Sequence, residues 1–444
     1  MRRGTQAGKG RENRQREPGL LAQLRRPPGG RDGRIMLLGQ FLDRAGSGVW
    51  GASSVLYFTF VTGLDARKLG LLLGAAGVAG IVGSPLAGRL AARSPVRALL
   101  IGCHLLRLVT LGLMLVCTGF YVLLPVVAVT SLGDRAAKTL EMLFATRLAG
   151  ERRTTYQALS RSSANAGYAF GAGIAAVGLA VGTHGAYRAL ILADALSFLV
   201  AAALVWRTRE PRDPGRVTAR SGGAATADRS PAPNPWRDRG YLRFVLLDIP
   251  MNLDDSILNV GLPLWLVNHT EAPRAIVPAF LVINTVLVVV LQIRVSARVG
   301  EPRQAASAVL VYGVTTLGCC TVLATATGGG AWSASIALLV SAALVTGAEL
   351  MRSVSSWELA VSLAPREARA PYLGVAGMAQ SIQKSAGPLL MTGAVLTAGP
   401  AGWLVLGVAV AGLSVVQRRG SLRRLDAVLP VAAPVGSRRT APQL

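Results

Sequence analysis

Charged residues are scarce in this chain of 444 residues, because only 16% are Asp, Glu, Lys or Arg whereas 51% are hydrophobic. A soluble domain of this size needs more charge to cover its surface. The apolar residues also occur in long blocks, such as Leu69 to Leu90, Ala305 to Thr327 and Ala401 to Val416. A hydrocarbon core about 30 Å thick needs roughly 20 apolar residues of helix. The composition therefore predicts membrane-spanning segments.

The same blocks exclude a transmembrane barrel. Only helices and closed barrels satisfy every backbone hydrogen bond in lipid, and a barrel is built from strands of about ten residues with alternating hydrophobicity. The apolar blocks of this chain are longer and continuous. We therefore expect an all-α membrane protein.

Cysteine and histidine are rare, with four and three residues. All four cysteines lie inside apolar blocks, which argues against a disulfide framework. The histidines are scattered and show no metal-ligand spacing. The chain has neither a phosphate-binding loop of the form G-x-x-x-x-G-K-[ST] nor a G-x-S-x-G nucleophile motif. We therefore expect no metal, no cofactor and no enzymatic activity, and an ion gradient or a partner must supply the energy for any active process.

Basic residues outnumber acidic ones, 47 to 22, and the formal net charge is +25. The arginines lie in the two tails and in alternate loops between the apolar blocks, which is the pattern of membrane orientation and not of a nucleic-acid site. On one side lie both tails and several arginine clusters, including Arg89 to Arg97 and Arg294 to Arg303, whereas the other side has few basic residues. We expect both termini to be cytoplasmic in a plasma-membrane protein, with the basic tail attracting anionic membrane lipids.

The apolar blocks predict six spans, a linker and six more spans. The spans are expected near 35–61, 69–90, 96–118, 120–146, 156–182, 186–206, 242–267, 273–297, 304–327, 332–357, 370–397 and 400–416. Residues 207–240 are rich in Pro, Gly, Arg and Ala and are expected to be a flexible cytoplasmic linker. The predicted units are thus a basic disordered tail (1–34), a six-helix bundle (35–206), the linker (207–240), a second six-helix bundle (241–417) and a second tail (418–444).

The loop between the second and third spans reads Gly88-Arg-Leu-Ala-Ala-Arg-Ser-Pro-Val-Arg97. It resembles the G-x-L-A-D-R-x-G-x-R loop motif of the major facilitator superfamily, and the matching residues are Gly88, Leu90, Arg93 and Arg97. Two six-helix halves joined by a long linker are also similar to that family. Ala92 replaces the acid of the motif, and this removes a charge contact that the resemblance would assign to steadying the outward-open state.

The fifth span contains Gly167, Gly171 and Gly173 in the segment GYAFGAG. It resembles the G-x-x-x-G-P motif of proton antiporters of the superfamily, with Ala172 in place of Pro. The alternative interpretation is plain helix packing through small residues. Together with Asp43-Arg44 in the first span, Pro263-Leu-Trp265 and the stretch from Glu349 to Pro365, the motif looks like actinobacterial drug-efflux-type members.

The seventh span carries a polar stripe. Asp248, Asn252, Asp255 and Asn259 are spaced by four, three and four residues, so that a regular helix places them on one face, with Asp254 pointing elsewhere. Charge inside a membrane helix is costly and usually faces a cavity. We expect Asp255 or Asp248 to exchange protons or to meet a cationic substrate. The alternative is a gate or interface contact.

The fourth span carries Asp134, Lys138 and Glu141, again at steps of four and three. Asp134 and Lys138 are expected to pair, with Glu141 within reach of Lys138. The ladder is either a self-neutralised structural network or a proton relay.

Further polar residues occur in spans of both halves. Asp43 lies in the first span beside Arg44, and Arg107 in the third span needs an acidic partner. The candidates for proton coupling are the acids Asp255, Asp248, Asp43, Asp134 and Glu141. The candidates for the substrate cavity are Arg44, Arg107, Lys138, Asn165, Asn252, Asn259, Glu349, Arg352, Gln380 and Lys384.

Three functions compete. The first is a proton-coupled secondary transporter, a monomer, that exports small amphipathic compounds such as drugs or a natural product by alternating access. The second is a proton-coupled importer of a small nutrient, which the low aromatic content of 5% disfavours because sugar sites usually stack on aromatic rings. The third is a membrane-embedded enzyme or receptor, for which no compact catalytic constellation is seen.

Overall fold

The computed structural model describes residues 26–181, 183–210 and 233–428, and these residues form helices and no strand. The first half contains α2 (Gly30–Leu56), α3 (Ala66–Arg93), α4 (Val96–Val116), α5 (Phe120–Ala149), α6 (Arg153–Val181) and α7 (His184–Trp206). The second half contains the segment from α9 (Arg239–Asp248) through α10 (Asp254–Ser256) to α11 (Leu262–His269), and then α12 (Val277–Arg298), α13 (Pro302–Thr325), α14 (Ala331–Ser362), α15 (Arg369–Leu390) and α16 (Gly399–Val428). This arrangement confirms the predicted fold class.

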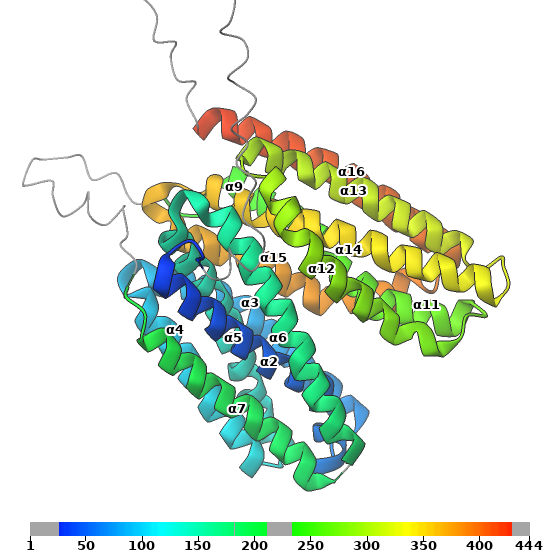
Figure 1. Ribbon diagram of the computed structural model, residues 1–444, viewed down its shortest axis with the longest axis horizontal. Coiled ribbons are helices and arrows are strands. Elements are labelled where there is room, and N and C mark those ends of the chain that lie inside the picture. The colour runs from blue at the N-terminus through cyan, green and yellow to red at the C-terminus, as the bar shows by residue number, and fades with distance from the viewer. Residues whose placement is uncertain (1–25, 182, 211–232, 429–444) are drawn as a thin grey trace, which may run out of the picture.

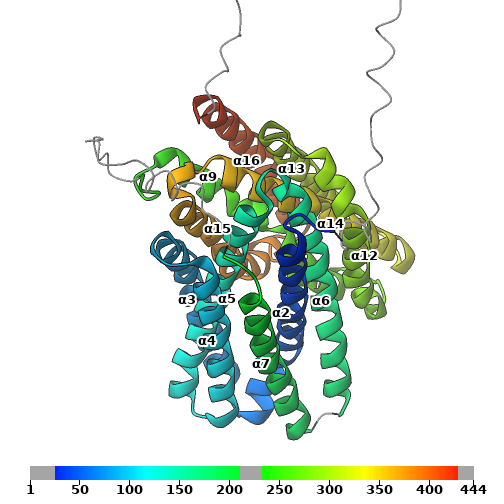
Figure 2. The same ribbon diagram turned by 60° about the vertical axis from the view of Figure 1, so that its left-hand side comes forward.

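The two halves are separate bundles that meet along a limited seam. Within the first half α2 packs on α6 and α3 on α5, and within the second half α13 packs on α14 and α16. Contacts between the halves are made chiefly by α3 with α15 and by α6 with α12. We call the end at which α2 begins and α16 ends the tail end. Figure 1 shows the halves meeting near α9 and diverging toward α7 and α11, and Figure 2 shows from another side that α6 lies next to α12.

Eight stretches of the described chain are long and apolar enough to cross a membrane, and one of them, Phe120–Gly178, holds both α5 and α6. The segments absent from this set are α2, α9 to α11, and α15. Each of them carries polar side chains that line the cavity described below, which lowers its mean hydropathy. Mean hydropathy therefore does not identify a membrane-spanning helix when one of its faces lines a polar cavity inside the protein.

Several helix ends differ from the predicted boundaries. α2 begins at Gly30, within the expected tail, and α16 continues to Val428, beyond the expected last span. α9 begins at Arg239, within the expected linker. Hydropathy marks the part of a helix inside lipid, whereas these helices continue into polar sequence outside it. The remaining tail and linker predictions concern residues 1–25, 211–232 and 429–444, which lie outside the described residues.

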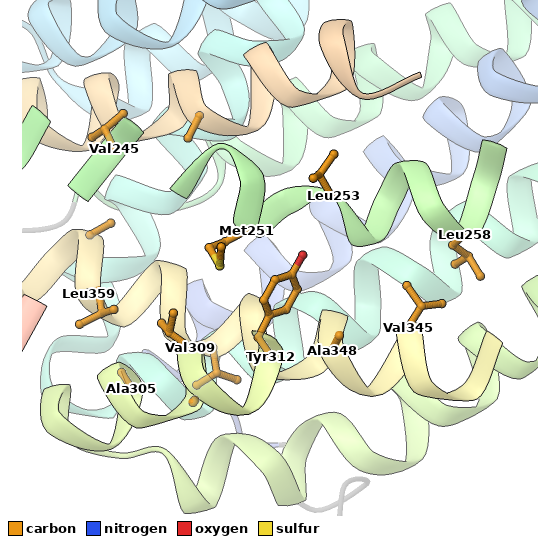
Figure 3. Close-up of a cluster of buried hydrophobic side chains, with 14 of the residues drawn as sticks. Val245, Met251, Leu253, Leu258, Ala305, Val309, Tyr312, Val345, Ala348 and Leu359 are labelled. Carbon is orange, nitrogen blue, oxygen red and sulfur yellow. The ribbon is translucent and has the colours of Figure 1, made fainter. Parts of the chain in front are cut away.

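The seventh span is not one regular helix. A 3₁₀ turn at Pro250–Asn252 separates α9 from α10, and a π-helical turn at Ile257–Gly261 separates α10 from α11. Pro250 and Pro263 have no backbone N–H to continue the helical ladder, so that the hydrogen-bond register shifts around each of them. The broken segment packs on a core of apolar side chains from α13 and α14, and Figure 3 shows Tyr312 of this core directing its hydroxyl toward the segment.

A charged clamp joins the start of α9 to the end of α16. Asp238 accepts hydrogen bonds from Arg424 Nη1 at 2.6 Å and Nη2 at 2.7 Å, from Tyr372 Oη at 2.9 Å and from the backbone N–H of Tyr241. The Arg424 hydrogen bonds lower the pKa of Asp238 to about 2. The clamp is therefore charged at neutral pH, and it anchors the last described residues of the linker to the second half.

Candidate substrate cavity

A cavity of about 830 Å³ lies between the two halves. Its walls come from α2, α5 and α6 on one side and from the α9–α11 segment, α14 and α15 on the other. Among the residues predicted as coupling or cavity residues, the lining includes Arg44, Arg107, Asp134, Lys138, Glu141, Asn165, Asp248, Asn252, Asp255, Asn259, Glu349, Arg352, Gln380 and Lys384. The structure thus brings together charged residues from both halves.

Asp43 is the predicted coupling residue that does not line the cavity. It is 1% exposed and accepts a hydrogen bond from Arg107 Nη1 at 2.6 Å. Arg107 also lies 3.3 Å from Asp134 Oδ1 and stacks over the Phe198 ring, 3.8 Å from its centroid. Arg107 therefore has the acidic partner that its position required, and it connects α4 to both α2 and α5. Asp43 lies behind the cavity wall.

The charged ladder of α5 pairs as predicted at one step and differently at the next. Lys138 Nζ donates to Asp134 Oδ2 at 2.6 Å. Glu141, in contrast, accepts from Arg44 Nη2 of α2 at 3.4 Å instead of pairing with Lys138. Arg135, one residue beyond Asp134, reaches across the seam and lies 3.5 Å from Gln380 Oε1 of α15. Since Arg107 of α4 also contacts Asp134, the ladder is part of a network that extends over α2, α4, α5 and α15.

The polar stripe predicted for the seventh span is only partly correct. Asp248 is buried and accepts hydrogen bonds from Ser356 Oγ at 2.8 Å and Gln417 Nε2 at 3.3 Å. Asp254 does not point away from the site, because it lines the cavity and lies 2.9 Å from Arg352 Nε. The break at Pro250 and the π-helical turn interrupt the 100° rotation per residue on which the prediction relied.

Asp255 and Lys384 form the loosest ion pair of the cavity. Lys384 Nζ lies 3.9 Å from Asp255 Oδ2, and the two side chains are 39% and 44% exposed. Asn259 Nδ2 lies 3.4 Å from the other carboxylate oxygen of Asp255. These groups face the cavity from α15 and from the broken span. Their charges are therefore accessible to a small molecule.

Polar contacts join α6 to α14 in the cavity wall and nearer the tail end. Arg161 donates to Glu349, which also accepts from Asn284 Nδ2 at 2.6 Å. Nearer the tail end, Arg153 donates to both carboxylate oxygens of Glu358, at 2.9 Å from Nε and 2.5 Å from Nη2. The sequence analysis missed this pair, because Arg153 is indistinguishable from the other arginines of the basic loops.

The loop motif lies where α3 crosses α15 at the tail end. A Cβ on Gly88 would lie 2.6 Å from the Ala370 carbonyl oxygen, so that only glycine permits this approach. Leu90 and Arg93 complete the end of α3, and the backbone N–H groups of Val96 and Arg97 donate to Glu210 at 2.9 and 2.8 Å. An acid does lie at this loop, although it comes from the end of the first half and not from position 92.

The glycines of the helix-five motif have different environments. A Cβ on Gly167 would lie 2.2 Å from the Phe41 carbonyl oxygen, and one on Gly171 would lie 1.8 Å from that of Ala45. A Cβ on Gly173 would meet no atom within 4 Å. Gly167 and Gly171 thus serve the close packing of α6 on α2, which supports the packing interpretation for these two positions.

The chain matches a protein-family model and is similar in structure to solved proteins. The family model described as Major Facilitator Superfamily matches residues 36–388. No curated protein matches the chain in sequence. Among solved structures, the proton:xylose symporter XylE is similar with a TM-score of 0.66 at 16% identity, covering 88% of this chain and 94% of that one. The similarity to the human organic anion transporter MFSD10 (TM-score 0.59, 14% identity) covers 91% of this chain and 100% of that one. The similarity to a bacterial homologue of the iron transporter ferroportin in an outward-facing state (TM-score 0.63, 15% identity) covers 88% of this chain and 98% of that one.

Proposed function

Because the chain belongs to the Major Facilitator Superfamily and is therefore a membrane transporter and not an enzyme, we propose that it exports small amphipathic compounds by proton-coupled alternating access. The observation that carries the proposal is the cavity between the halves. Its walls combine ionisable side chains with apolar ones, among them Trp50, Leu258 and Leu281. Such a mixed lining suits a ligand that has both a charged group and an apolar body.

Asp255 is the proposed coupling acid. Asp134, Asp248 and Asp254 are each held by at least one partner at 2.9 Å or less, whereas the nearest cation to Asp255 is 3.9 Å away. An accessible carboxylate with a loose partner exchanges protons with water in the cavity more readily than one fixed in a network. A cationic group of a substrate competes with the proton for the same carboxylate, which is the basis of antiport.

The orientation assigns the structure to one stage of the proposed transport cycle. Basic loops gather at the tail end, which by the positive-inside rule is cytoplasmic. Arg153 pairs with Glu358 near this end and Arg161 pairs with Glu349 in the cavity wall, and both contacts hold the halves together. The structure then corresponds to the outward-facing stage of the cycle, in which an exporter releases its substrate and takes up protons.

Nutrient import is the second candidate. The amide side chains of Asn165, Asn259 and Gln380 line the cavity and are suited to hydrogen bonding with hydroxyl groups. The similar fold of a proton:xylose symporter is compatible with either direction. The two candidates differ in the direction of proton-driven accumulation.

The test is transport by inside-out and right-side-out vesicles containing the full-length protein, with a panel of amphipathic dyes and sugars. We expect dye accumulation in inside-out vesicles with an acidic lumen, and its loss when a protonophore collapses the gradient. The Asp255→Asn variant should retain downhill exchange but lose accumulation. The control is Asp426→Asn, because Asp426 pairs with Arg303 at the exposed tail end, far from the cavity. Accumulation of sugars only, and only in right-side-out vesicles, would refute export.

A further inference from the structure

Among the described residues that line the cavity, Asp255 and Lys384 form the longest and most exposed ion pair. Its 3.9 Å separation is too long for a hydrogen bond. No oxygen atom of the described residues accepts a hydrogen bond from Lys384, although its ammonium group has three donors. By contrast, Arg352 is held by Asp254 at 2.9 Å and by Asn252 Oδ1 at 3.0 Å. The loose pair thus presents one positive and one negative charge, side by side, to the cavity.

Building on the proposed transport function, we infer that this pair binds the zwitterionic head of an amphipathic substrate of the α-amino acid type. In an α-amino acid the ammonium nitrogen lies about 2.5 Å from the carboxylate carbon, since two bonds of about 1.5 Å meet at about 111°, and it lies about 3 Å from the carboxylate oxygens. That spacing is within about 1 Å of the 3.9 Å between Lys384 Nζ and Asp255 Oδ2, so that one head can contact both groups. Laid antiparallel on the pair, the head places its ammonium on Asp255 and its carboxylate on Lys384.

The remaining walls suit the rest of such a molecule. Trp50, Tyr168, Leu258 and Leu281 line the same cavity and provide apolar surface for a side chain. A ligand with only one charge satisfies one member of the pair and is repelled by the other. A purely cationic compound meets Lys384, and a purely anionic one meets Asp255. The arrangement therefore selects for the zwitterion over either singly charged analogue.

The inference is tested by measuring, with ligand-observed NMR, how small probes bind to the purified full chain in lipid nanodiscs. The probes are L-phenylalanine, phenethylamine and 3-phenylpropionate, which share one scaffold and differ only in whether both charges are present. We expect phenylalanine to bind at least about tenfold more tightly than either analogue, the effect of one additional charge-assisted contact in a partly desolvated site. Equal binding of the three probes, or no binding of phenylalanine, overturns the inference.

Two variants test which charged group of the ligand is bound by Lys384 and which by Asp255. Lys384→Met should reduce phenylalanine binding to the level of phenethylamine and leave phenethylamine binding equal or improved. Asp255→Asn should reduce phenylalanine binding to the level of 3-phenylpropionate and leave 3-phenylpropionate binding equal or improved. Asp426→Asn, outside the cavity, should keep the parent preference. A uniform loss for all probes in Lys384→Met would indicate a structural role for Lys384 and would contradict the assignment. Proton-driven dye transport is measured separately, so that it can persist when this inference fails.

Discussion

At the scale of single residues, the charged side chains of the cavity differ in how completely they are paired. Asp134 has Lys138 at 2.6 Å, Arg107 at 3.3 Å and Arg135 at 3.7 Å. Removing a charge from water costs several kcal/mol, and partners at this distance offset the cost. The loss of one cation from this group leaves Asp134 with two others, whereas the loss of the carboxylate leaves three cations facing one another.

We therefore predict that Asp134→Asn destabilises the protein by about 3–5 kcal/mol, more than Lys138→Met, which should cost about 1–3 kcal/mol. The double variant should lose less than the sum of the two, with a coupling energy of about 0.5–3 kcal/mol. Unfolding in detergent, followed by tryptophan fluorescence, measures the cycle. The matched control is the exposed pair Arg303–Asp426, for which the same cycle should give almost no coupling. Additive losses for Asp134 and Lys138 would argue against direct pairing.

At the scale of elements, helical periodicity predicted α5 well and the seventh span poorly. α5 is a regular helix from Phe120 to Ala149, so that the four-residue step from Asp134 to Lys138 correctly predicted their pairing. In the seventh span, two non-α turns change the rotation between Asp248 and Asn259. Pro250 was visible in the sequence, but the direction in which it turns the following residues depends on the core packed beneath them. Asp254 was misplaced for this reason.

The crossing of α2 and α6 gives a prediction at this scale. Gly171→Ala should destabilise the protein by about 1–3 kcal/mol, because the new Cβ would overlap the Ala45 carbonyl oxygen and force the helices apart. Gly173→Ala, on the same helix, meets open space and should be neutral or stabilising by up to about 1 kcal/mol, since alanine favours helix more than glycine. Thermal unfolding of the two variants in the same detergent provides the comparison. Equal melting temperatures would show that Gly171 does not determine this packing.

At the scale of the whole molecule, the sequence predicted the two halves because each membrane span leaves a hydropathy and charge signal. It could not predict how the halves meet. Arg153 and Glu358 are 205 residues apart, and neither stands out from its neighbours in the chain. Their pairing depends on the relative position of α6 and α14, which is a property of the folded state and of its place in the transport cycle. Most of the polar cavity residues were predictable, whereas their contacts across the two halves were not.

The Arg153–Glu358 pair leads to a prediction about this arrangement. Alternating access requires the halves to separate at the tail end, and the structure holds them there with Glu358, whose side chain is 1% exposed, bound through both oxygens to Arg153. Glu358→Gln removes the charge and keeps the size. We expect it to shift the equilibrium toward a tail-open form by about tenfold, which corresponds to roughly 1.4 kcal/mol.

Electron paramagnetic resonance distances between spin labels at Glu151 and Glu367, two exposed tail-end positions in different halves, report the separation in a background without native cysteines. Glu358→Gln should enlarge the population with long distances, and adding Arg153→Met should cause little further change because the interaction is already lost. Arg152→Gln removes a neighbouring exposed charge and should leave the distances as in the parent. An unchanged distribution in Glu358→Gln would mean that the seam between α3 and α15, where Gly88 lies against Ala370, is sufficient to keep the tail end closed.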